Sequence, residues 1–290
     1  MKAPPVAYVK PASLAEVFDA LDRYGEDARL LAGGQSLLAA LNLRLAPPAV
    51  LIDINGLDEL AGITLGGGVL RIGALTRHRT VEHSPDIARH APLIAQAMPH
   101  IAHPAIRNRG TFGGSIAFAD PAAELPACCV ALDASIVVAS RHAERRIPAH
   151  AFFRGLYETA LEPREIVIAG EFPIAQPTLR SAFLELARRH GDYAIAGIAA
   201  HARYEDKRFH DVRLAFFGLG PAPRLATGAC AALESESYSD TVVRAAQAAL
   251  EHDLAPEGDL YQTAATKMHL ARVLTARAIA KLAAHAESPL

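Results

Sequence analysis

The sequence predicts an α+β protein with more than one domain, and three observations support this fold class. The chain has 290 residues, which is long for a single hydrophobic core and favours two or three modest domains. Hydrophobic residues make up 51% of the chain and the formal net charge is −2, as in ordinary globular proteins. Strand-like and helix-like segments fall into three regions with different element orders.

The first region, residues 1–55, has the pattern of a small βαβ-like unit. A helix is expected over 13–24, with Ser13 as its N-cap and Glu16 in the capping-box position. The other elements expected here are a strand at Ala28–Ala32, a helix at Leu37–Leu45 and a buried strand at Ala49–Ile54.

The second region, residues 56–176, is rich in strands. Gly66-Gly67-Gly68 is predicted to be the turn of a β-hairpin, a structural role, because no helix follows it. The elements expected here are strands at Ile63–Leu65, Val69–Ile72, Ser135–Ala139 and Ile166–Phe172, and helices at Pro85–Met98 and Ala122–Leu132.

The third region, residues 177–290, is predicted to form a separate C-terminal domain. Two strands, Ala194–Tyr204 and Phe209–Gly218, are joined by the polar turn 205–208. Two helices follow at about 239–252 and 260–285, and the last is long and amphipathic.

Composition excludes several classes of protein. The sequence lacks the clustered basic face that a nucleic-acid-binding protein would show. No window approaches the ~20 apolar residues that a membrane span needs. The N-terminus has no continuous apolar stretch of a secretory signal, so we expect a cytoplasmic protein. Cys128, Cys129 and Cys230 form no CxxC pair, so an iron–sulfur cluster or zinc site would have to lie on a partner. The histidines lack supporting metal ligands, and we expect no metal site.

Two glycine segments are the candidate ligand-binding sites of the sequence. The first (residues 32–37) comprises Ala32, Gly33, Gly34, Gln35, Ser36 and Leu37, between a predicted strand and a predicted helix. Adjacent glycines allow positive φ and close approach of the backbone to a ligand, and their N–H groups suit a pyrophosphate. The spacing fits neither a Walker loop nor the Rossmann GxGxxG motif. A plain strand-to-helix turn is the competing interpretation.

The second segment (residues 106–115) contains Thr111, Gly113, Gly114 and Ser115, and the polar run Asp120–Glu124 follows it. Two such segments from separate parts of the chain could grip both phosphates of a dinucleotide. Neither contains a lysine, so backbone dipoles and hydroxyl groups would hold the anion.

The blocks AGGQSLLAALNLRLAPPAVLIDI, LRIGALTRH, IRNRGTFGGSIAFADPAAELPA, FFRGLYETALEPREIV and ARRHGDYAIAG resemble the medium, FAD-binding subunit of the molybdenum hydroxylases. This family includes carbon monoxide dehydrogenase and, more distantly, xanthine dehydrogenase. The blocks occur in the family's order and cover essentially the whole chain.

The resemblance implies a vanillyl-alcohol-oxidase-type (PCMH-type) FAD-binding fold. Its two α/β subdomains would span residues 1–55 and 56–176, and an antiparallel sheet with helices would form residues 177–290. It also implies a large molybdopterin subunit that oxidises the substrate and a small subunit with two [2Fe-2S] clusters. The FAD of this chain would pass electrons to an external acceptor, usually within a dimer of heterotrimers.

The resemblance also implies cofactor contacts, position by position. Residues 32–37 match the family's first pyrophosphate loop, and Thr111, Gly113, Gly114 and Ser115 match the second. Gln35 replaces the histidine that covalent flavoproteins of this fold often carry, which favours non-covalent FAD. The other expected contacts are Ile101, Asp120, Glu124, Val167 and Tyr193, the last covering one face of the flavin.

Two departures from the family pattern put individual contacts in doubt. Phe118 stands where many relatives have a histidine, and Leu184-Glu185 replaces a lysine-bearing segment. Two other functions stay open. A stand-alone flavin oxidase or reductase would need its own acid or base, and an assembly protein that has lost FAD would not need both glycine segments.

Overall fold

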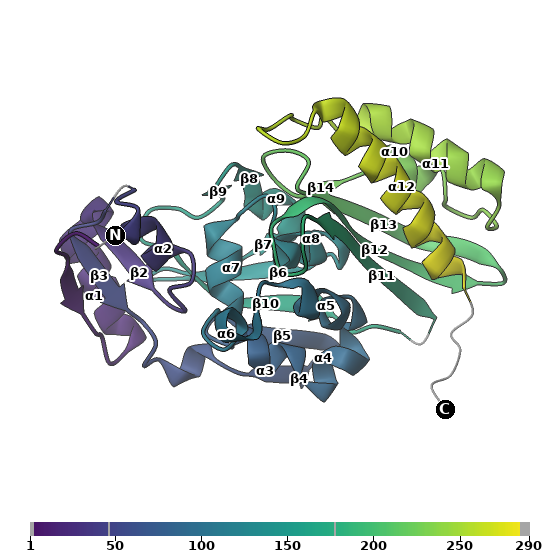
Figure 1. Ribbon diagram of the computed structural model, residues 1–290. Coiled ribbons are helices and arrows are strands. Elements are labelled where there is room, and N and C mark those ends of the chain that lie inside the picture. Colours follow the sequence, from purple (N-terminus) through teal and green to yellow (C-terminus); the bar gives the residue numbers. More distant parts are fainter. Residues whose placement is uncertain (1–2, 46, 177, 285–290) are drawn as a thin grey trace.

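The computed structural model describes residues 3–45, 47–176 and 178–284, and its three regions follow one another across the molecule (Figure 1). The first region is a parallel sheet of strand order β1-β3-β2. Ser13 caps α1, since its hydroxyl accepts a hydrogen bond from the Glu16 N–H at 3.3 Å. The βαβ unit is confirmed. Its elements are β1 Ala7–Val9, α1 Leu14–Tyr24, β2 Ala28–Leu31, α2 Leu37–Asn42 and β3 Val50–Asp53.

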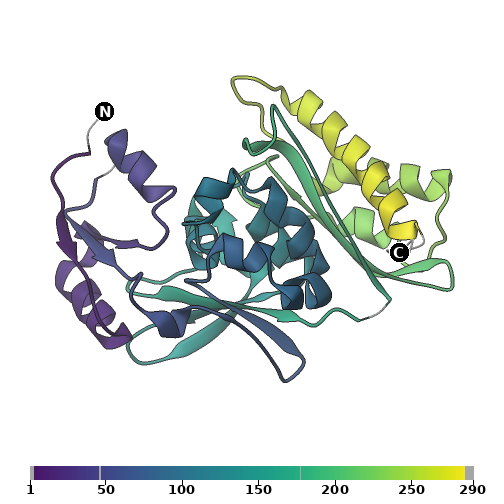
Figure 2. The ribbon, with the colours of Figure 1, turned by 60° about the horizontal axis from the view of Figure 1, so that its bottom comes forward.

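The second region is an antiparallel sheet of order β4-β5-β10-β6-β7. A group of short helices covers one of its faces (Figure 2). One end of the other face packs against the first region, where Val17 and Phe18 share a hydrophobic cluster with Val137 and Ile168. The strands are β4 Ile63–Gly66, β5 Val69–Gly73, β6 Ser135–Ala139, β7 Glu144–Pro148 and β10 Ile166–Pro173; a small hairpin has β8 Phe153–Gly155 and β9 Glu158–Thr159. The helices are α3 His78–Glu82, α4 Pro85–His90, α5 Pro92–Ala97, α6 Pro104–Arg107, α7 Phe112–Phe118, α8 Glu124–Ala131 and α9 Ala149–Phe152.

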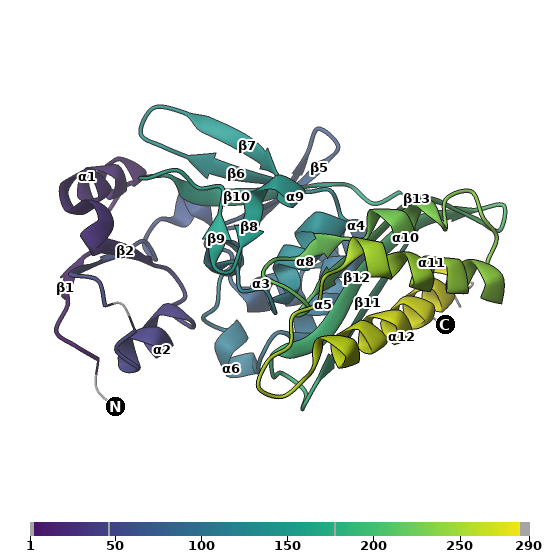
Figure 3. The same cartoon turned by 90° about the horizontal axis from the view of Figure 1, so that it is seen from above.

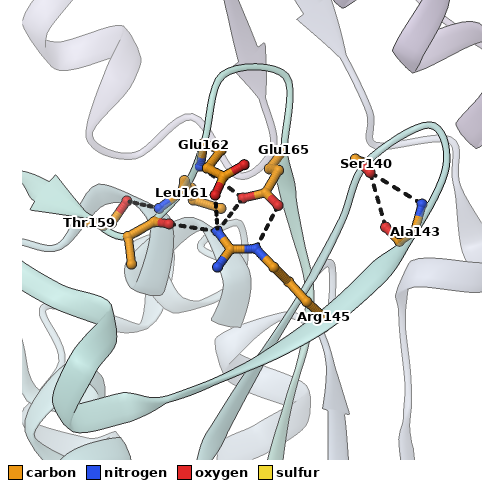
Figure 4. Close-up of polar contacts among 8 residues, drawn as sticks. Ser140, Ala143, Arg145, Thr159, Leu161, Glu162 and Glu165 are labelled. Carbon is orange, nitrogen blue, oxygen red and sulfur yellow. Dashed lines mark hydrogen bonds and ion pairs between the residues drawn. The ribbon is translucent and has the colours of Figure 1, made fainter.

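An arginine on β7 fixes the loop that leads into β10 (Figure 4). Arg145 makes a bidentate contact with Glu165, with both N···O distances at 2.7 Å, and donates to the Ala160 carbonyl at 2.8 Å. The Arg145 guanidinium lowers the pKa of Glu165, so this pair is charged at neutral pH. The contact anchors the start of the strand that carries Val167.

The third region is an antiparallel sheet of order β11-β12-β13-β14. One face buries α10, α11 and α12, which lie together on the outer side of the molecule (Figure 3). The other face contributes Phe183 and Phe217 to the core formed with the helices of the second region. The elements are β11 Leu179–Ala187, β12 Ala194–Glu205, β13 Arg208–Phe217, β14 Arg224–Leu225, α10 Thr227–Ala231, α11 Asp240–Asp253 and α12 Ala264–Ala283.

The structure corrects several expected elements. The single helix expected at Pro85–Met98 is two helices, α4 and α5, because Pro92 begins a new helix and Ala91 leaves the helical conformation. The last helix begins at Ala264 rather than 260, and residue 285 lies outside the described residues. Strand β11 and helix α7 were not predicted. No helix within the described ranges has both the length and the apolarity that crossing a membrane requires.

Candidate functional site

The two glycine segments touch each other, although they come from different subdomains. A Cβ built on Gly33 would lie 2.8 Å from Gly110 Cα and still closer to the Arg109 carbonyl oxygen. Only glycine allows this approach without displacing backbone. The tertiary structure therefore places residues 32–37 directly beside residues 106–115, as two grips on one ligand require.

Arg77 and Asn55 hold this junction together. Arg77 donates to Asn55 Oδ1 at 2.7 Å and also to the Arg109 carbonyl. Asn55 Nδ2 in turn donates to the Ala32 carbonyl at 2.7 Å. Neither residue was singled out from the sequence, because each acts through backbone atoms far away along the chain. The only sequence signal for Arg77 was its place in the LRIGALTRH block.

The first glycine segment has unsatisfied backbone donors. The N–H groups of residues 33–37 donate to no other backbone group in the described part of the chain. Gly34 has φ of +73°, whereas Gly33 is not in the positive-φ region, so only one glycine of this pair needs that conformation. Gln35 Nε2 donates to the Gly33 carbonyl at 3.1 Å and stiffens the turn. A row of free N–H groups suits an anionic ligand such as a pyrophosphate.

The second glycine segment is built differently, which the sequence did not indicate. It begins helix α7, with Thr111 as the N-cap whose hydroxyl accepts from Gly114 N–H at 3.2 Å. Gly113 N–H donates to the Ala74 carbonyl at 2.8 Å, and a Cβ on Gly113 would lie 2.8 Å from Ala74 Cα. Gly113 serves close packing against Ala74, and neither glycine of this pair has positive φ.

His78 supports the second segment from behind. Its Nε2 lies 2.9 Å from the Thr111 carbonyl, and its backbone N–H donates to the Gly110 carbonyl at 2.9 Å. Burial lowers the pKa of His78 to about 4, and the charges of Arg107 and Arg77 act in the same direction. The imidazole is therefore neutral at physiological pH, with its proton on Nε2.

A group of acidic and aromatic side chains lies where the polar run meets the C-terminal domain. Asp120 is buried, its pKa is raised by that burial, and it interacts with the Tyr157 hydroxyl. Partial burial and the negative charges of Asp120 and Glu124 raise the pKa of Tyr193, whose side chain is largely exposed, at 69% for the residue. Asp120, Glu124 and Tyr193 are therefore neighbours. Burial, followed by the charges of Glu185 and Asp120, raises the pKa of Glu124 to about 8.

The two remaining expected residues are buried. Ile101 is 8% exposed and Val167 is 6% exposed, and both belong to the core of the second region. The loop of Tyr193 packs next to Ile101, because a Cβ on Gly191 would lie 2.8 Å from the Ala102 carbonyl oxygen. Ile101 is thus close to the loop that carries Tyr193.

Comparison with known proteins gives a consistent result. The family described as the FAD binding domain in molybdopterin dehydrogenase matches residues 4–175, and the CO dehydrogenase flavoprotein C-terminal domain matches residues 181–282. The chain is 36% identical to the carbon monoxide dehydrogenase medium chain of Hydrogenophaga pseudoflava, over 96% of this chain and 97% of the relative. It is 36% identical to the nicotine 6-hydroxylase medium subunit of Paenarthrobacter nicotinovorans, over 98% and 99% of the two chains.

Solved structures agree with these matches. Carbon monoxide dehydrogenase from Hydrogenophaga pseudoflava, in a form that lacks the Mo-pyranopterin moiety, superposes with a TM-score of 0.95 at 36% identity, covering 97% of this chain and 98% of that chain. Quinoline 2-oxidoreductase from Pseudomonas putida 86 superposes with a TM-score of 0.92 at 36% identity and covers 98% of each chain.

The fold is that of an FAD-binding flavoprotein of the PCMH type. Within that class, the chain belongs to the FAD-binding medium subunits of the molybdenum hydroxylases, a family of oxidoreductase subunits.

Proposed function

We propose that this chain binds FAD non-covalently and passes electrons from iron–sulfur clusters of a partner subunit to an external acceptor. The observation that carries the proposal is the row of free N–H groups at residues 33–37, pressed against the second glycine segment. A bound FAD can accept electrons singly and release them in pairs, which links cluster chemistry to two-electron acceptors. The Gln35 side chain already bonds the Gly33 carbonyl and offers no nucleophile for a covalent link.

The proposal assigns roles to the expected residues. Residues 32–37 would bind the pyrophosphate through backbone N–H groups, with the hydroxyls of Thr111 and Ser115 on its other side and Gly113 and Gly114 setting their position. The contacts expected around the flavin ring are Ile101, Asp120, Glu124, Val167 and Tyr193. The Tyr193 ring is suited to cover one flavin face, because the residue is 69% exposed.

The proposed partners follow from the family. Curated relatives are medium chains or FAD-binding subunits of multi-subunit dehydrogenases, among them a nicotine 6-hydroxylase and a carbon monoxide dehydrogenase. We therefore infer a large molybdopterin subunit and a small [2Fe-2S] subunit, assembled as a dimer of heterotrimers. The substrate would be oxidised on the large subunit, so this chain alone would be inactive toward it.

Two experiments test the proposal. The purified chain, reconstituted with FAD, should be yellow, and acid precipitation should release the flavin into the supernatant. Flavin that stays in the pellet would contradict non-covalent binding, and a chain that stays colourless would contradict FAD binding.

The second experiment tests activity. The FAD-loaded chain should oxidise aldehydes and N-heterocycles, with an artificial acceptor, only after the other two subunits are added. Substrate-dependent flavin reduction by the chain alone would favour a stand-alone flavoenzyme.

A further inference from the structure

A buried arginine holds the segment that lies next to the loop of Tyr193. Arg107 is the last residue of α6 and is only 7% exposed. Its Nη1 donates to the Ile101 carbonyl at 3.0 Å and to the Ala102 carbonyl at 3.1 Å. No backbone N–H in the described part of the chain donates to either carbonyl, so Arg107 supplies their hydrogen bonds.

Glu82 on α3 fixes the direction of this guanidinium. Its Oε2 accepts a hydrogen bond from Arg107 Nε at 2.8 Å. This pairing offsets part of the cost of burying the guanidinium charge, since an unpaired buried charge is expensive. The guanidinium is planar and its donors form a rigid fork, so the direction of Nε also sets the direction of Nη1. Arg107 therefore reaches the two carbonyls in one fixed orientation.

The Ala102 peptide supports the loop that carries Tyr193. Gly191 has φ of +80°, and a Cβ built on it would lie 2.8 Å from the Ala102 carbonyl oxygen. This is the same oxygen that accepts from Arg107. Within the loop, Asp192 Oδ1 accepts from the Tyr193 N–H at 3.0 Å. A shift of the Ala102 carbonyl would therefore displace the loop, and the Tyr193 ring with it.

We propose that Arg107 is a positioning residue of the candidate cofactor site, because it holds the Ala102 carbonyl on which the loop of Tyr193 rests. The proposal rests on the proposed function, in which the Tyr193 ring covers one face of the flavin. A loop that is held in place before the cofactor arrives lowers the entropic cost of binding. The competing interpretation is that Arg107 serves only its ion pair with Glu82, in which case changing either partner should have the same effect.

Amide hydrogen exchange of the cofactor-free chain tests the support without any flavin. Arg107→Lys keeps a positive charge beside Glu82 but cannot reproduce the fork that reaches both carbonyls. Exchange at residues 188–193 should therefore become about tenfold faster, as the loss of such hydrogen bonds implies. Glu82→Gln is the matched control, because the amide oxygen of glutamine can still accept from Nε. Exchange at residues 188–193 should stay at the wild-type rate in this control.

Gly191→Ala tests the same contact from the side of the loop. The added Cβ would press on the Ala102 carbonyl oxygen and displace the loop while Arg107 is unchanged. FAD affinity and the absorption spectrum of the bound flavin should change as they do in Arg107→Lys. Gly68→Ala is the matched control, because Gly68 has a similar φ of +77° but its Cβ would meet nothing within 4 Å. Wild-type affinity and spectrum in Gly191→Ala would overturn the proposal.

A double-mutant cycle measures whether Arg107 acts through Tyr193. Arg107→Lys should weaken FAD binding by about fivefold. In the Tyr193→Ala background the same substitution should cause no further loss, because the ring that Arg107 positions is already absent. Losses that multiply in the double variant, or wild-type exchange at residues 188–193 in Arg107→Lys, would overturn the proposal. A chain that binds no FAD would contradict the proposed function, whereas faster exchange in Arg107→Lys would still support the role of Arg107 in holding the loop.

Discussion

Gly33 and Arg109 lie in backbone contact where the two glycine segments meet, so the first subdomain and the second share one junction. Arg77 spans the same junction by donating to the Arg109 carbonyl and to Asn55. Contacts within the chain therefore set the spacing of the two segments, and ligand binding is not needed to bring them together. A dinucleotide would bind to loops already held together, which lowers the entropic cost of binding.

Replacing Gly33 with alanine should weaken FAD binding by at least about tenfold, and valine should abolish it. The added Cβ would meet the backbone of Arg109 and Gly110 and push the segments apart, so the effect comes from loop packing rather than from positive φ. Titration of the cofactor-free chain with FAD, followed by flavin fluorescence, measures the affinity. Gly66→Ala is the matched control, because its Cβ would meet nothing within 4 Å. Equal affinity in Gly33→Val and wild type would show that this contact is irrelevant to binding.

Gly114→Val should also lower FAD affinity, through a different contact. A Cβ on Gly114 would lie 2.7 Å from the Thr111 hydroxyl oxygen, which caps α7. Loss of a helix cap costs about 1 kcal/mol, so the melting temperature should fall modestly while the fold survives. Thr111→Val removes the same cap without adding bulk at residue 114, and similar losses in both variants would assign the effect to the cap. Wild-type affinity and melting temperature in Gly114→Val would refute this role.

Arg77→Met should reduce FAD affinity more than it reduces overall stability. The variant keeps the aliphatic part of the side chain but loses the hydrogen bonds to Asn55 and Arg109, so the two segments can move apart. Arg77→Lys should recover only part of the affinity, because one ammonium group does not reproduce the forked geometry of guanidinium. Arg89→Met, at an exposed position, is the control. A loss of stability with unchanged affinity per folded molecule would contradict this positioning role.

Glu124→Gln should flatten part of the dependence of stability on pH. Folding raises the pKa of Glu124 from the ordinary 4.5 to about 8, so the folded state binds a proton that the unfolded state lacks between these values. Stability from this group is therefore complete below pH 4.5 and is lost as pH rises to about 8, by about 1.4 kcal/mol per pH unit at most. Urea unfolding across this window measures it in both proteins.

The effect of Glu124 is given by the difference in the free energy of unfolding between Glu124→Gln and wild type at each pH. His78 and His201 have pKa values lowered by burial to about 4, so their contribution rises with pH between about 4 and 6.5 and has the opposite sign. Subtracting one free energy of unfolding from the other removes the histidine contributions, because both proteins contain the same histidines. A difference that does not change with pH would show that Glu124 is ionised in the folded chain.

Tyr193→Ala should leave the melting temperature nearly unchanged and alter the flavin. The residue is 69% exposed, so its removal costs little folding energy. If its ring covers the flavin, the variant should show weaker FAD binding and a shifted flavin absorption spectrum, and Tyr193→Phe should restore both. Tyr238→Ala, another exposed tyrosine, is the control. An unchanged spectrum and affinity would place Tyr193 away from the cofactor.

Much of the order of the elements followed from local patterns. Ser13 with Glu16 predicted the start of α1, and the strand expected at Ser135–Ala139 is β6 at the same residues. Errors arose where local preference was ambiguous: Pro92 divides one expected helix into two, and the glycines of α7 concealed a helix that Thr111 caps. Strand β11 was not predicted, and the structure pairs it with β12 along its whole length.

By itself, the sequence determined the α+β class, the two glycine segments and, through its family resemblance, the expected cofactor. Such features depend on residue type at short spacing, which is visible along the chain. Only the tertiary structure showed that Gly33 touches Arg109, that Arg77 ties the segments together, and that Glu124 is buried. These relationships join residues far apart in sequence, and burial and charge proximity, which set the protonation of Glu124, exist only after the chain has packed.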